Sequence, residues 1–283
     1  MLVGDQKFLI DPGPSSTLST LESELAVRGI EIADLNAILL THIHLDHAGA
    51  TGSLVRKNPR IKVYVHAKGA AHMADPTKLL SSAVRLYGER MDALYGEFLP
   101  VPSDKLHVLE GGETLQFDSR ELRVLYTPGH ASHHVTYFDT TEKVAFVGDT
   151  AGICVEGNPF ILPATPPPDI DLEVWNASLD AIAASQPTRL FLTHFGFSEH
   201  PARHIASYRE CLRHWSDLVG TLLSTTTDEA QAMAAFSTAV NAETGRSLST
   251  EEANHYVFNG ALDISWAGLA RYHRKRASAM AQS

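Results

Sequence analysis

Short apolar runs rich in β-branched residues recur through the first two thirds of the chain and alternate in places with segments of helical periodicity. Glycine, proline or charged residues bound most of these runs, which is typical of strands. Because the runs follow one another directly in some regions and alternate with helices elsewhere, they indicate a mixed sheet or paired sheets with helices outside. The expected strands are Lys7–Ile10, Asn36–Leu40, Ile61–Val65, Leu106–Leu109, Glu121–Leu125, Val135–Phe138, Val144–Val147 and Arg189–Leu192.

Helical periodicity predicts two further parts of the chain. Between Asp75 and Tyr95, apolar residues recur at helical spacing, so we expect one amphipathic helix there. After His200 the chain is expected to be almost wholly helical, and Thr226–Glu229 and Ser249–Glu252 each resemble a capping box. We therefore predict an αβ domain over residues 1–200 with a helical insert at about 75–100, and a helical C-terminal extension over 201–283 packed on it. Shorter helices are expected over Leu18–Arg28 and Ala48–Arg56.

Composition narrows the class of protein. The 283 residues are 44% hydrophobic, an ordinary globular balance that argues against a disordered chain. Their formal net charge of −10 weighs against nucleic acid as a partner. The two cysteines, Cys154 and Cys211, lie far apart, so we expect no disulfide framework and a reducing, cytoplasmic location. The chain start lacks the pattern of a signal peptide, and no run approaches the roughly 18 apolar residues of a membrane span. We expect no membrane partner.

Histidine placement carries the chemical signal, because 15 histidines are present and several cluster. His42, His44, Asp46 and His47 follow directly on the apolar run that ends at Leu40. In extended chain, residues two apart point the same way, so His42 and His44 can present their imidazoles to one point. Imidazole nitrogen and carboxylate oxygen are ligands of ions such as zinc, and left unligated this cluster would bury polar groups without partners. The sequence therefore predicts a metal site.

Three more ligand candidates stand alone, each just past an apolar run. His130 lies in Thr127-Pro-Gly-His130, Asp149 follows Val147-Gly148, and His194 follows Thr193. Loops at strand ends carry functional residues on a rigid scaffold. Each residue could be a turn residue when considered singly, but together with the first cluster they indicate one site.

These residues, in this order, resemble the metallo-β-lactamase superfamily of metallohydrolases, and specifically its glyoxalase II-like or lactonase-like members. The resemblance runs from Asp11 in Leu9-Ile-Asp-Pro-Gly through the HxHxDH motif to Thr193-His194. It implies an αββα sandwich with two metals at one edge, and here also a helical insert and a helical C-terminal extension. It further implies that Asp149 bridges both metals, that Asp46 and Asp149 act in catalysis, and that Asp11 supports the site. The implied ligands are His42, His44 and His130 for one metal, and Asp46, His47 and His194 for the other.

Two divalent cations flanking a water lower its pKa enough to supply hydroxide near neutral pH. Zinc is the expected metal, although the ligands would also accept iron or manganese. Hydrolysis of an ester, lactone, thioester, amide or phosphodiester is implied, and we favour a carboxylic ester, lactone or thioester of a small molecule.

Three other functions stay open. A phosphodiesterase or ribonuclease of the same superfamily would need a polyanion groove, which the negative charge disfavours. A persulfide-oxidising member would use one iron held by two histidines and one aspartate. Such members lose part of the second ligand set, which is present here. A non-catalytic structural zinc site would be rich in cysteine.

Access to the site is expected to depend on two segments. The proline-rich loop over residues 152–170 leaves Asp149 directly and should form one wall of the pocket. We expect Ile153, Phe160 and Ile161 to line the entrance together with the helical insert, whose apolar stripe would equally suit a homodimer contact. His133 and His134 are interpreted either as additional site residues or as polar residues that orient a neighbour.

Overall fold

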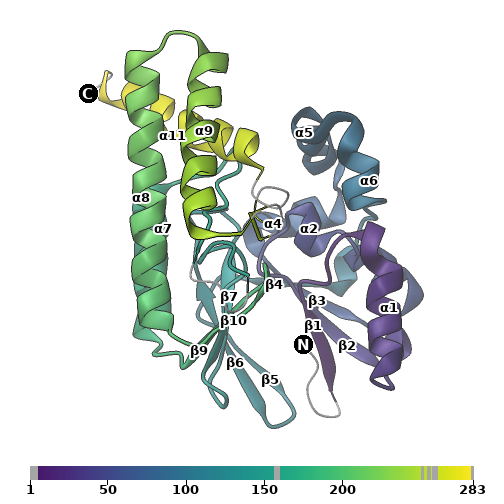
Figure 1. Cartoon of the computed structure of the whole chain (residues 1–283). Helices are drawn as coiled ribbons and strands as arrows, with labels where there is room; N and C mark the ends of the chain where they lie inside the picture. The colour runs from purple at the N-terminus through teal and green to yellow at the C-terminus, as the bar shows by residue number, and fades with distance from the viewer. Residues whose placement is uncertain (1–5, 156–159, 250–251, 254–255, 257–260, 282–283) are drawn as a thin grey trace. The chain divides into compact units, whose positions relative to one another are not determined.

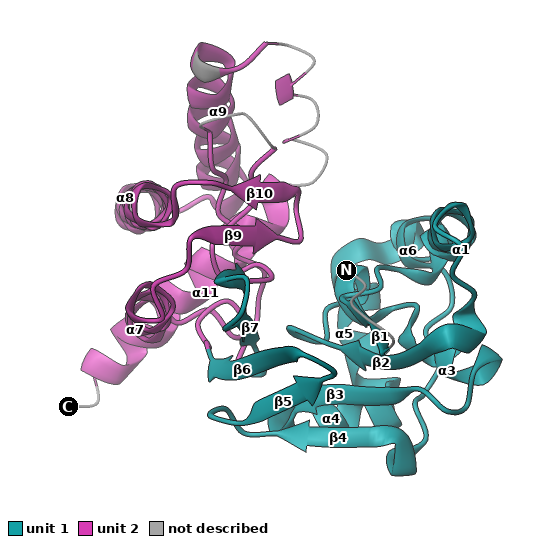
Figure 2. Ribbon diagram, turned by 90° about the horizontal axis from the view of Figure 1, so that it is seen from below, with its two compact units in different colours: residues 1–126, 133–146 teal, residues 127–132, 147–283 magenta. Residues whose placement is uncertain are grey.

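The structure, a computed structural model, describes residues 6–155, 160–249, 252–253, 256 and 261–281, and it contains two compact units (Figure 1, Figure 2). Unit 1 comprises residues 1–126 and 133–146, and unit 2 comprises residues 127–132 and 147–283. This division does not fall at residue 200. The expected separation of a C-terminal extension at that point stays a prediction.

A four-stranded parallel sheet forms one layer of unit 1 (Figure 2). Its strands, in spatial order, are β1 (Lys7–Ile10), β2 (Leu35–Leu39), β3 (Lys62–His66) and β4 (Leu106–Leu109). Parallel neighbours need long crossover connections, and the chain supplies helices for them. Ile10 pairs with Leu39, so β1 and β2 end side by side at the same edge. The connecting helices are α1 (Leu18–Val27), α2 (Leu45–Ala48), α3 (Thr51–Lys57), α4 (Ala67–Ala74), α5 (Thr77–Tyr87) and α6 (Met91–Tyr95).

Antiparallel strands form the second layer of unit 1. They are β5 (Thr114–Phe117), β6 (Arg120–Tyr126), β7 (Val135–Asp139) and β8 (Val144–Phe146), each paired with the next. Every residue of β7 is buried, because β7 meets the parallel sheet. The Tyr137 hydroxyl donates to the Leu40 carbonyl at 2.9 Å, and the Val135 N–H donates to the Thr41 carbonyl at 2.7 Å. These bonds tie β7 to the chain that follows β2.

Unit 2 is mostly helical and has an aromatic core. Trp215 meets Phe236 edge to face, with ring centroids 5.2 Å apart, and Phe236 lies 5.8 Å from Trp266. These rings come from three helices that pack together (Figure 1). The elements are α7 (Leu172–Ala184), β9 (Arg189–Leu192), β10 (Gly196–Ser198), α8 (Pro201–Thr225), α9 (Glu229–Ser247) and α11 (Leu262–Met280).

The expected single helix between Asp75 and Tyr95 is wrong in one respect. Helix α5 ends at Tyr87, a 3-10 turn covers Gly88–Arg90, and α6 follows. Gly88 has φ +54°, which a right-handed helix cannot contain, so the chain bends there. Ala83 and Met91 of the apolar stripe join the core of unit 1, whereas Val84 is exposed; the pocket wall or homodimer contact expected of the stripe stays a prediction.

One of the two predicted capping boxes is also wrong. Helix α9 begins after Asp228, whose carboxylate accepts the N–H groups of Ala230 and Gln231, so Thr226 is not the cap. The second capping box is confirmed: Ser249 and Glu252 exchange side-chain to main-chain hydrogen bonds at 2.8 and 3.3 Å.

Among the helices that the structure describes, none combines the length and apolar character needed to cross a bilayer. The cytoplasmic location, the absence of a nucleic-acid partner and a homodimer contact stay predictions.

Candidate metal centre

The first group of predicted ligands lies where β1 and β2 end. Asp11 follows β1 directly and has φ +49°, and its N–H donates to the Leu39 carbonyl at 3.1 Å. The HxHxDH segment follows β2 and turns into the four-residue helix α2 at Leu45. Because the two strands are parallel neighbours, Asp11 and the first histidine start from the same edge of the sheet.

Asp11 holds this segment through three hydrogen bonds. Its Oδ1 accepts the Thr41 N–H at 2.8 Å, and its Oδ2 accepts the Thr41 hydroxyl at 2.7 Å and the His47 Nδ1–H at 2.9 Å. The Asp11 and His47 side chains are 1% and 0% exposed. Hydrogen bonds to a charged group in such a buried place are strong and position their donors closely.

These bonds determine which ring nitrogen carries the proton. The Thr41 hydroxyl has one proton and donates it to Asp11, so at 3.0 Å it accepts the Nδ1–H of His42. His47 donates its own Nδ1–H to Asp11. In both rings the lone pair therefore lies on Nε2, the form in which imidazole binds a metal.

Potential ligand atoms lie in pairs within unit 1. His42 Nε2 is 3.0 Å from His44 Nδ1, and His47 Nε2 is 3.6 Å from Asp46 Oδ2. Two atoms that each lie about 2.1 Å from one tetrahedral ion are about 3.4 Å apart. The chemistry and spacing of these donors therefore fit a metal, with His42 and His44 as one pair and Asp46 and His47 as another.

The second group of predicted ligands lies in unit 2. His130 is in the loop between β6 and β7, and its Nδ1–H donates to the Ala164 carbonyl at 2.8 Å, which leaves the lone pair on Nε2. Gly129, with φ +134°, lets the loop pass so close to Trp175 that an added Cβ would lie 2.3 Å from the Trp175 Cβ. The loop therefore packs directly on α7 at Gly129, and the next residue, His130, is held by its bond to the Ala164 carbonyl.

Asp149 lies between two imidazoles. Its Oδ2 is 3.6 Å from His130 Nε2, and its Oδ1 is 3.5 Å from His194 Nε2. Asp149 follows β8 after Gly148, whose φ is +50°, and His194 follows β9. Each carboxylate oxygen thus faces a different histidine, which is the arrangement that a bridging ligand requires.

His133 and His134, whose role was left open, both belong to unit 1. His133 Nδ1 accepts the N–H of Ile43, between the two histidines of the motif, at 3.4 Å. The His134 ring centroid lies 5.1 Å from that of His42. His133 thus contacts the backbone between His42 and His44, and both interpretations of its role stay predictions.

Sequence reasoning missed the role of Thr41 and of the Ala164 carbonyl. Thr41 precedes His42 directly, as Thr193 precedes His194, and that recurrence was the available signal. A backbone carbonyl leaves no such signal.

The helical insert approaches Asp46 within unit 1. Burial raises the pKa of Tyr95 far above its usual value, and the neighbouring Tyr87 and the charge of Asp46 add to this shift. The Tyr95 and Tyr87 rings meet edge to face, with centroids 4.9 Å apart. The charge of Asp46 thus acts on the Tyr95 hydroxyl of the helical insert. On the loop expected to form the other wall, Ile153 and Ile161 are buried, and the predicted entrance stays a prediction.

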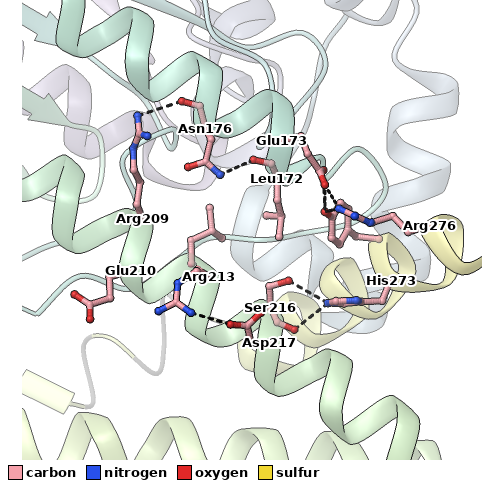
Figure 3. A pocket seen from close by; sticks show the side chains of 12 residues that line it. Leu172, Glu173, Asn176, Arg209, Glu210, Arg213, Ser216, Asp217, His273 and Arg276 are labelled. Carbon is pink, nitrogen blue, oxygen red and sulfur yellow. Dashed lines mark hydrogen bonds and ion pairs between the residues drawn. The ribbon is translucent and has the colours of Figure 1, made fainter.

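A pocket of about 540 Å³ lies elsewhere in unit 2, between α7, α8 and α11 (Figure 3). Among its charged side chains, Arg213 meets Asp217 at 3.0 Å, and Arg276 contacts Glu173. None of the seven predicted ligands lines it.

Comparison with known proteins agrees with these observations. The family model of the metallo-beta-lactamase superfamily matches residues 1–194. A metallo-beta-lactamase fold-containing protein of Sulfurisphaera tokodaii is 28% identical over 66% of this chain and 68% of its own length. A hydroxyacylglutathione hydrolase of Haemophilus influenzae is 33% identical over 50% of this chain, but the match spans 59% of that relative.

A solved structure, of a metallo-beta-lactamase family protein from Thermus thermophilus, superposes with a TM-score of 0.69. It covers 98% of this chain and 87% of its own, at 21% identity, and so bears on the fold alone. The expected fold is confirmed: two sheets, helices outside them and a helical C-terminal region. The chain belongs to the metallo-beta-lactamase superfamily.

Proposed function

We propose that this chain is a dinuclear metallohydrolase that cleaves a carboxylic ester, lactone or thioester of a small molecule. The observation that carries the proposal is the buried hydrogen-bond network of Asp11, Thr41, His42 and His47, which directs two imidazole lone pairs away from Asp11. A network of this kind orients metal ligands. The Nε2 atom of His42 is thereby held beside His44 Nδ1, and that of His47 beside Asp46 Oδ2, so each lies next to a second donor that suits the same ion.

We assign His42, His44 and His130 to one metal, and Asp46, His47 and His194 to the other, with Asp149 bridging both. The paired donors of unit 1 support this division, since His42 lies by His44 and Asp46 lies by His47. The two oxygens of Asp149, one facing His130 and one facing His194, support the bridging role. Zinc fits this nitrogen and oxygen set, and iron or manganese remains open as the metal in the cell.

In this proposal each protein group has a defined task. Two divalent cations, when bound, would polarise the scissile carbonyl and activate a water molecule as the nucleophile. Asp149 keeps the spacing of the ligands on either side of it, and Asp46 adds negative charge beside His47. Asp11 keeps His47 and, through Thr41, His42 in the tautomers that bind metal.

A thioester is the first substrate class to test. Several relatives carry the name hydroxyacylglutathione hydrolase, and they are matched over 41% to 65% of their own length. That name describes the cleavage of a thioester, and this analogy with the relatives is the reason to test a thioester before a lactone or an ester.

Purified protein loaded with zinc should be assayed against panels of thioesters, lactones, aryl esters and phosphodiesters. We expect turnover in one of the first three classes, and none in Asp149→Ala. Asp180→Ala, which removes an exposed carboxylate paired with Arg209, is the matched control and should keep full activity. Persulfide-dependent oxygen uptake by a protein with a single iron would contradict the proposal, as would activity on phosphodiesters alone.

A further inference from the structure

One buried side chain near the C-terminus holds both arms of the loop that follows Asp149. The Tyr256 hydroxyl accepts the N–H of Val155 at 2.8 Å and donates to the carbonyl of Phe160 at 2.8 Å. The Tyr256 ring is fully buried and meets the Phe160 ring edge to face, with centroids 5.2 Å apart. Because one phenol oxygen serves both bonds, it fixes the distance between these two backbone positions.

The same loop is bonded to the predicted metal ligand His194. The Cys154 N–H donates to the His194 carbonyl at 2.7 Å, and the Phe195 N–H donates to the Cys154 carbonyl at 2.7 Å. Ile153 and Leu162 exchange two backbone bonds at 2.8 and 2.9 Å, which closes the base of the loop. Cys154 thus lies between His194 and the residue that Tyr256 holds.

The hydroxyl of Tyr256 makes a contribution separate from that of its ring. The ring alone could pack against Phe160, and a buried hydroxyl is unfavourable unless it is bonded. Here both of its strong bonds go to the main chain of one loop, about a hundred residues earlier in the chain. The contact therefore serves the position of the loop.

We propose that Tyr256 is a positioning residue for the metal site: it fixes the loop at Val155 and Phe160, and through Cys154 it fixes the main chain of His194. This inference rests on the proposed function insofar as it takes His194 to be a metal ligand. Residues that support a ligand from behind commonly change metal affinity by about 10- to 100-fold when they are removed.

Cys154 provides a direct probe of the contact that the Tyr256 hydroxyl makes with Val155 and Phe160, which we call the latch. Its thiol is buried and lies 3.7 Å from the carbonyl of Val155, the residue whose N–H bonds to Tyr256. The only other cysteine, Cys211, lies on α8 and forms no disulfide, so a Cys211→Ser background leaves one thiol to follow. The rate at which a buried thiol is labelled depends on how often local opening of the structure exposes it to the reagent.

Tyr256→Phe is the test variant, because it keeps the ring and removes only the hydroxyl. Tyr272→Phe is the matched control: Tyr272 is also a buried tyrosine of unit 2 whose hydroxyl bonds to Glu173 and Arg276. Labelling of Cys154 by an aromatic disulfide reagent is measured on the full-length, metal-free chain. We expect the rate to rise about tenfold or more in Tyr256→Phe and to stay at the wild-type value in Tyr272→Phe.

Zinc titration of the same variants then measures the coupling to His194. We expect the more weakly bound equivalent to lose affinity about tenfold or more in Tyr256→Phe, with the other equivalent unchanged. A labelling rate in Tyr256→Phe equal to that of the wild type would show that the hydroxyl does not hold the loop. Faster labelling in Tyr256→Phe with unchanged zinc affinity would show that Tyr256 does not position His194. A wild-type chain that binds no second zinc contradicts the proposed function instead, and the labelling rate still decides whether Tyr256 holds the loop.

Discussion

Replacing Asp11 by asparagine tests the network that sets the histidine tautomers. Asp11 accepts three hydrogen bonds, and in the variant an amide oxygen can still accept the Thr41 N–H. An NH₂ group then replaces Oδ2 and faces two donors, the Thr41 hydroxyl and the His47 Nδ1–H. Each bond to a charged group contributes about 1.5–3 kcal/mol. With partial relaxation, we expect the unfolding free energy of the metal-free chain to fall by about 3 kcal/mol.

Metal affinity should fall as well. To relieve the clash of donors, His47 must move its proton to Nε2, which removes the lone pair that a metal would use. We expect zinc to bind about 10- to 100-fold more weakly, by analogy with other supporting residues of metal ligands. Competition with a chromophoric chelator measures the affinity, and urea unfolding measures the stability. Asp104→Asn, which changes an exposed carboxylate of the same unit, is the control. A variant that binds both equivalents as wild type would refute the assignment of the tautomers.

Four further substitutions test other parts of the structure. Asp149→Ala and His130→Ala should each abolish hydrolysis while circular dichroism and thermal unfolding stay close to wild type, and full activity in either variant would disprove the assigned role. Gly129→Ala places a methyl group 2.3 Å from the Trp175 Cβ and should destabilise the chain by about 2–4 kcal/mol. In Gly245→Ala the methyl group meets nothing within 4 Å, and an equal loss there would contradict the close approach. Burial lowers the pKa of His204, although its bond to the Ala151 carbonyl opposes this shift. In the unfolded chain this histidine binds a proton near pH 6.5, whereas in the folded chain it stays neutral to a lower pH. The unfolding free energy should therefore fall as the pH falls below about 6.5, by at most about 1.4 kcal/mol per pH unit. His204→Gln should flatten the dependence in urea unfolding between pH 5 and 6.5, and an unchanged slope would count against this cause.

The sequence was sufficient for the strands that are strongly apolar. Lys7–Ile10, Leu106–Leu109 and Arg189–Leu192 were expected with the bounds that the structure has. The strands β5 and β10 were missed because they contain few apolar residues: Thr114-Leu-Gln-Phe117 has two, and Gly196-Phe-Ser198 has one. The break at Gly88 was missed because glycine is tolerated within a helix, and only the backbone shows that φ is positive there.

The candidate metal ligands were recognisable because the motif gathers three histidines and one aspartate within six residues. The contacts that orient these side chains could not be recognised from the sequence. The partner of His130 is the backbone carbonyl of Ala164, to which any residue could contribute, and Tyr256 meets Val155 across about a hundred residues of chain. Such long-range contacts depend on how the chain folds back on itself, and no local pattern encodes them.

Metal content tests the dinuclear proposal most directly. Native mass spectrometry of the full-length chain, purified without chelators and then supplied with zinc, counts the ions that each molecule retains. Two ions should be retained by the wild-type chain and no more than one by Asp149→Ala, because the bridging carboxylate faces both histidines that flank it. A wild-type chain that retains one ion or none, or an Asp149→Ala variant that retains two, would contradict the proposal.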